Sequence, residues 1–139
     1  MEFVFDRTES DVLLGNEKGR YTYQDLNRVE TAVAILCQLA EKLDIHLGLY
    51  TKTNWAEPGL FSADSWPTES QMRRYLQNVH RLCDALDLSC ALPVSMAKLD
   101  WEGANSIEEA LAAALVRIQR IINTYQYSGE LIAGEEQVI

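Results

Sequence analysis

The chain of 139 residues carries 21 acidic against 12 basic side chains, so its net charge is −9 and its isoelectric point is near 4.6. This balance disfavours nucleic-acid binding, which needs clustered Lys and Arg, and it disfavours anionic membrane surfaces for the same reason. A hydrophobic fraction of 47% and three tryptophans argue against a disordered chain, and the length predicts one domain over residues 1–139.

No apolar run approaches the ~20 residues that a membrane-spanning helix needs, and the N-terminus lacks the basic and apolar regions of a signal peptide. We therefore expect a protein of the cytoplasm, or one assembled from the cytoplasm. Three cysteines, Cys37, Cys83 and Cys90, are interpreted as reduced thiols, because their number is odd and the first two fall on or beside apolar helix positions.

The N-terminal residues predict a short arm followed by a short helix. Phe3-Val4-Phe5 suits an edge strand or an anchor on the core. Thr8 and Asp11 have the spacing of a capping box, which predicts a helical turn or short helix beginning there. The turn residues of 15–19 end it.

A long helix is predicted over about residues 23–44. Thr22 suits its N-cap, and Asp25 lies near its positive end. One apolar stripe follows at alternating steps of three and four residues: Leu26, Val29, Val33, Leu36, Ala40 and Leu43. Residues 46–67 show no sustained period but are rich in aromatic side chains, so we expect a long aromatic loop that folds back over the helices.

Two further long helices complete the predicted fold. Thr68 and Gln71 form a capping box that predicts a helix over about 69–86, and a compact connector follows, with one helical turn starting at Pro93. A third stripe predicts a helix over about 106–126, and the last ten residues suit a short β excursion or a partly ordered end. The expected fold is all-α: an antiparallel bundle of three long helices with short terminal arms and a minor β element from the termini.

Sites for chemistry are poorly marked. The best metal candidate is His80-x-x-Cys83 with Cys90 and Cys37 or His46, but Cys83 lies in the apolar stripe and His80 lies well away from it. Nucleophile elbows and glycine-rich phosphate loops are missing from the sequence. We therefore predict no catalytic residue, no metal and no cofactor, and a protein that is not an enzyme.

Two features suit contact with a protein partner. Three aromatic residues of the loop, Trp55, Phe61 and Trp66, can serve either as partner contacts or as internal anchors. The helix over 69–86 has a basic face that is either solvated or a docking surface for an acidic partner: Arg73, Arg74, His80 and Arg81.

Four segments in order resemble one family of small proteins from phages and prophages of Firmicutes. The first is Phe5–Val12, similar to a DRTxxDV pattern, and the second is Gly19–Glu30, similar to YNYxDLNRVE. Residues 66–79 resemble PTxxxMxRYLxNV, and residues 127–135 resemble YSGExxxGE. Trp66 departs from the family, which more often has an aliphatic residue there.

The resemblance implies a place near tail, baseplate or fibre proteins, in the bacterial host cytoplasm or on the virion, and carries over no catalytic residue. The expected function is that of a non-enzymatic structural or adaptor protein acting by protein–protein contact, with self-association as a further option. The alternative is a cytosolic accessory or regulatory module that binds a partner protein. A small hydrolase is the remote alternative.

Overall fold

The computed structural model describes residues 1–57 and 66–136, with side chains up to Thr124. These residues form four α-helices and two 3₁₀ helices, with no strand among them, so the fold is helical and the predicted β element is wrong for the described part of the chain. The α-helices are α1 (Glu9–Leu14), α2 (Tyr23–Glu41), α3 (Glu69–Ala85) and α4 (Trp101–Glu136); the 3₁₀ helices are η1 (Glu17–Gly19) and η3 (Met96–Lys98).

Local capping sets the starts of three helices as the sequence predicts. Thr8 with Asp11, Thr22 with Asp25 and Thr68 with Gln71 each form a capping box, in which each side chain accepts a backbone N–H of the other residue. Gly15 ends α1 in the left-handed conformation, which costs glycine no steric penalty.

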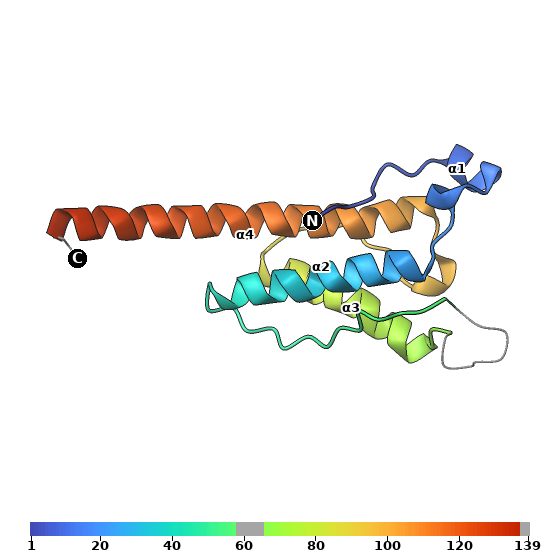
Figure 1. Cartoon of the computed structure of the whole chain (residues 1–139), viewed down its shortest axis with the longest axis horizontal. Helices are drawn as coiled ribbons and strands as arrows, with labels where there is room; N and C mark the ends of the chain where they lie inside the picture. Colours follow the sequence, from blue (N-terminus) through green and yellow to red (C-terminus); the bar gives the residue numbers. More distant parts are fainter. Residues whose placement is uncertain (58–65, 137–139) are drawn as a thin grey trace.

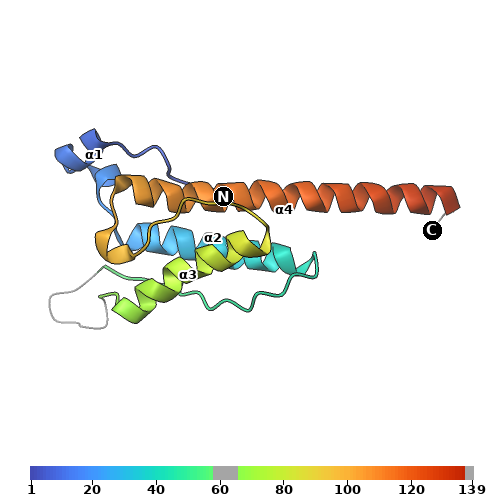
Figure 2. The same ribbon diagram turned by 180° about the vertical axis from the view of Figure 1, so that it is seen from behind.

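The three predicted stripes meet in one core between α2, α3 and α4. Its members are nearly inaccessible to solvent, with Leu36, Val79, Leu82, Ile107, Leu111, Ala114 and Ile118 all at 0% exposure. Along α4 this burial stops near Ile118, because Ile121 is already 36% exposed. Both views show α4 continuing well past the ends of α2 and α3 (Figure 1 and Figure 2).

The three long helices run in the same direction, so the predicted antiparallel arrangement is wrong. Figure 1 shows α2, α3 and α4 all starting at one end of the molecule and running toward the other. The connections between the helices make this possible. The 19 residues of α2 span about 28 Å, and about nine extended residues at ~3.3 Å each are enough to lead the chain back over that distance. Antiparallel neighbours follow from short connections, and here both connections are long.

Residues 46–57, the described part of the predicted loop, lead the chain back along α2 and α3 and are called the return segment below. Asn78 Nδ2 and Arg74 Nη1 donate to the Tyr50 carbonyl at 2.8 and 2.9 Å, and Arg81 Nη2 donates to the Leu47 carbonyl at 3.3 Å. The backbone of this segment is therefore bonded to polar side chains of α3, and Lys52 N also donates to Glu30 of α2.

The ends of α4 differ most from the prediction of a helix over 106–126. It starts at Trp101 because the Asp100 carboxylate accepts the Gly103 N–H at 2.7 Å. It continues to Glu136 through Gly129, since one glycine inside a helix costs only about 1 kcal/mol. The turn expected at Pro93 forms instead as η3, capped by Ser95. The helix after 22 ends at Glu41 and the helix after 68 ends at Ala85, both close to the predicted ends.

Candidate functional site

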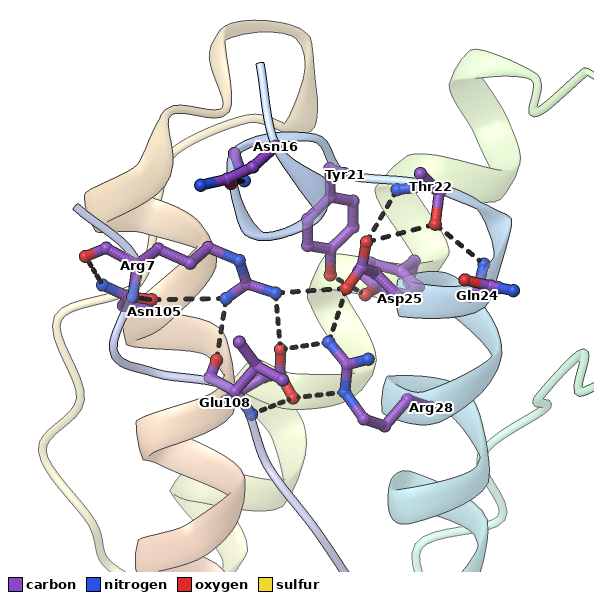
Figure 3. A network of polar contacts seen from close by, with 12 residues as sticks. Arg7, Asn16, Tyr21, Thr22, Gln24, Asp25, Arg28, Asn105 and Glu108 are labelled. Atoms are coloured by element: carbon purple, nitrogen blue, oxygen red, sulfur yellow. Dashed lines mark hydrogen bonds and ion pairs between the residues drawn. The ribbon is translucent and has the colours of Figure 1, made fainter. Parts of the chain in front are cut away.

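A buried ion cluster joins the N-terminal arm to α2 and α4 (Figure 3). Glu108 of α4, at 0% exposure, accepts hydrogen bonds from Arg7 Nη2 at 2.8 Å and from Arg28 Nε and Nη2 at 2.8 and 2.7 Å. Asp25 Oδ1 accepts from the same two guanidinium groups at 3.2 and 2.5 Å. These contacts raise the pKa of Arg28 above its ordinary value, chiefly through the hydrogen bond to Glu108. Two arginines and two carboxylates thus balance in charge.

Asn105 completes this cluster by fastening the arm to α4. Its Oδ1 accepts the Arg7 backbone N–H at 3.1 Å, and its Nδ2 donates to the Arg7 carbonyl at 2.9 Å. Beside the cluster, the hydroxyl groups of Tyr21 and Tyr75 share a hydrogen bond, and burial raises the pKa of both phenols. Both tyrosines therefore stay neutral and serve as a polar link between the start of α2 and α3.

A second buried cluster fastens the return segment to α2 and α3. Glu30, 1% exposed, accepts from Arg74 Nη1 and Nη2 at 2.6 and 2.9 Å and from Trp55 Nε1 at 2.7 Å. Asn27 bonds both the N–H and the carbonyl of Trp55, at 2.7 and 2.8 Å. The hydrogen bond to Glu30 is the main cause of the raised pKa of Arg74.

The chemistry of both clusters is that of structural ion pairs. Within the described part of the chain, no buried side-chain nitrogen or oxygen lacks a hydrogen-bond partner. A fully satisfied polar network of this kind fixes which segments lie against one another, because any other arrangement strands a buried charge. The clusters therefore position the elements around them.

An open cavity of about 1110 Å³ lies at the end of the bundle where the long helices start. Its lining is mainly apolar and comes from the starts of α2 and α3, from η3 and from both edges of the aromatic loop: Tyr23, Leu26, Trp55, Glu57, Trp66, Met72, Arg73, Leu76, His80, Val94, Met96 and Leu99 among others. Trp66 is 58% exposed and Val94 is fully exposed. Residues 58–65, which connect the lining residues Glu57 and Trp66 in the sequence, lie outside the described residues.

Comparison with protein-family models, with curated proteins and with solved structures found no match. The described residues include no helix both long and apolar enough to cross a membrane.

The structure separates the predicted partner-contact residues into two groups. Trp55, at 4% exposure, belongs to the core, and Arg74 is bonded to the buried Glu30, whereas Arg81 is exposed and donates to the Leu47 carbonyl. Trp66 and Arg73 do lie together on the cavity rim, where Arg73 pairs with Glu69 at 3.0 Å. Phe61 lies outside the described residues.

The residues of the weighed metal candidate do not come together. His80 is exposed on the cavity side, whereas Cys83 is buried in the core. In residues 1–57 and 66–136, no group of three His, Cys, Asp or Glu side chains is placed to hold a metal ion.

Helix periodicity did not predict that the acidic side chains of Asp25, Glu30 and Glu108 are buried. The available signal was the resemblance: its patterns DRTxxDV, YNYxDLNRVE and MxRYLxNV contain most of the polar members of both clusters. These are Arg7, Asp25, Asn27, Arg28, Glu30 and Arg74.

His46, just after α2, gives a testable pH effect. Its ring nitrogens lie 2.9 Å from Glu41 Oε1 and from Asp44 Oδ1, and these hydrogen bonds raise the pKa of His46 above 6.5. Its contribution to stability is complete below the unfolded pKa and is lost as pH rises through the higher folded pKa. We expect Glu41→Gln to lower the pKa of His46 in an NMR titration, and Asp44→Asn to lower it less. A wild-type pKa at or below 6.5 would contradict these ion pairs.

Proposed function

We propose that this protein is a non-enzymatic structural or adaptor protein of a phage or prophage tail or baseplate, acting by protein–protein contact. The four sequence segments that resemble the phage family support this biological setting, for which we propose the host cytoplasm, with association to the virion as a further option. The cavity beside Trp66 supports the mode of action.

The exposed apolar rim of this cavity is the observation that carries the proposal. Trp66 and Val94 are large apolar side chains held in solvent next to a mainly apolar floor. Exposed tryptophan and arginine around an apolar depression are typical of interface hot spots.

The helices and the loop have separate roles in this proposal. The ion clusters hold α2, α3 and α4 as a rigid scaffold, and the connections between these helices present the contact residues, Trp66 just before α3 and Val94 between α3 and α4. Preorganised contact residues bind with less loss of conformational entropy. A second copy of the chain is a further possible occupant, which sedimentation of the purified protein distinguishes from a different partner.

Binding to purified tail and baseplate proteins from the genome that encodes this chain tests the proposal. We expect Trp66→Ala and Val94→Asp each to weaken binding by about tenfold or more, as hot-spot losses do. Val116→Asp is the matched control, because Val116 is 51% exposed on α4 and is not among the residues lining this cavity. All three variants should keep the wild-type helical content by circular dichroism.

Other outcomes decide between the alternatives. Equal binding by all variants would exclude the cavity as the contact. Failure of every tail and baseplate protein to bind, together with absence of the chain from purified virions, would favour the accessory or regulatory module. Hydrolysis by the wild-type protein of a panel of ester and phosphoester substrates would revive the small hydrolase.

A further inference from the structure

Two cysteines that are seven positions apart in sequence meet at the end of α3. Cys83 Sγ and Cys90 Sγ lie 3.0 Å apart. Asp87 takes a positive φ of 56°, and the Leu88 N–H donates to the Cys83 carbonyl at 2.9 Å, so the chain reverses tightly after α3. This reversal, rather than the helix itself, brings Cys90 back over Cys83.

We propose that Cys83 and Cys90 are a redox modification site, which a small disulfide compound such as oxidised glutathione converts into an intramolecular disulfide bond. The sulfur atoms need to approach by only about 1 Å to reach bonding distance, and the turn that joins them is already closed. This site does not depend on the proposed function. The sequence predicts that both cysteines are reduced thiols, and the proposal adds that an oxidant joins them.

The reaction proceeds by two thiol–disulfide exchanges. The Cys90 thiolate attacks one sulfur of the disulfide compound, forms a mixed disulfide and releases one reduced thiol. Cys83 then loses its proton and attacks Cys90 Sγ, which releases the second reduced thiol. The cysteine pair loses two electrons, the disulfide compound gains them, and the protons of the two cysteines pass to the two released thiolates.

The environments of the two thiols favour this order. Cys83 is 3% exposed, and burial is the main cause of its raised pKa, so it is a poor initial nucleophile. Cys90 lies in the connection between α3 and α4 and is only partly buried, so its thiol is open to solvent. Once the mixed disulfide has formed, Cys83 needs no access to solvent, because Cys90 Sγ already lies against it.

The bond would fasten the end of α3 to the connection that leads toward α4. Between the two cysteines, the Leu86 carbonyl accepts a hydrogen bond from Arg117 of α4 at 2.7 Å. A closed ring here restricts the unfolded chain, so oxidation should raise the melting temperature by about 5 °C or more.

Titration of the purified protein with graded mixtures of oxidised and reduced glutathione tests the site, with thiols counted after denaturation. The chain has three cysteines, so oxidation at this site leaves one free thiol, Cys37, which serves as the internal control. Peptide mapping should recover a Cys83–Cys90 linkage. Cys37→Ser should behave as wild type in linkage and melting temperature, whereas Cys83→Ser and Cys90→Ser should show no rise on oxidation.

Either of two results would overturn the site. The first is three free thiols retained in excess oxidised glutathione under native conditions. The second is a linkage that includes Cys37, within or between chains. A Cys83–Cys90 linkage that lowers the melting temperature would support the chemistry and overturn the stabilising effect.

Discussion

Val79→Asp is expected to abolish cooperative unfolding of the protein. Val79 is at 0% exposure in the middle of the core that α2, α3 and α4 share. An unpaired carboxylate there costs several kcal/mol, against a total stability of roughly 5–15 kcal/mol for a domain of this kind. Urea unfolding followed by circular dichroism should lose its sigmoidal transition, and Val33→Asp in α2, at 2% exposure, should do the same.

Val94→Asp is the matched control for this experiment, since the same chemical change is made at a fully exposed valine. Its unfolding free energy should stay within about 0.5 kcal/mol of wild type. If Val79→Asp unfolds with the wild-type midpoint and slope, the shared core is assigned wrongly.

Glu108→Gln should lower the unfolding free energy by about 3 kcal/mol or more, because it removes the fully buried negative charge that Arg7 and Arg28 share. The amide also turns one N–H₂ group toward guanidinium donors, which cannot accept it. Denaturant unfolding at neutral pH measures the loss, and an unchanged slope would show that the folded state keeps its compactness.

Glu109→Gln is the control here: the same substitution one position along α4, at an exposed side chain. Its effect should stay within about 0.5 kcal/mol. A double-mutant cycle adds a sharper criterion: Arg7→Met should cost less in the Glu108→Gln background than in wild type, because the two residues share one ion pair. Additive losses would mean that Glu108 acts through packing alone.

The ion clusters also explain how the described helices keep one defined arrangement. Helices with apolar stripes can pack in several registers and in either direction at similar cost. Glu108 and Glu30 each lie at 1% exposure or less and each require an arginine from a distant segment. Wrong registers leave these charges unpaired, so the clusters select one arrangement among the packed alternatives.

The sequence by itself determined where the helices start and which face of each is buried. The caps at Thr8, Thr22 and Thr68 were predictable, because a capping box depends on side chains three residues apart. The three stripes were predictable for a similar reason, since the periodicity of a helix is a local property of the chain. The location of Trp55 in the core was one of two readings that the sequence left open.

Only the tertiary structure decided the direction of the helices, the members of the ion clusters and the place of the cavity. Arg7 and Glu108 are 101 positions apart, and Glu30 and Arg74 are 44 apart, so no local pattern links them. The parallel course of α2, α3 and α4 depends on long return segments, and the first of these is bonded to side chains of both α2 and α3. Such pairings form only when the whole chain is packed, because the free energy of burying a charge depends on what distant segment arrives to neutralise it.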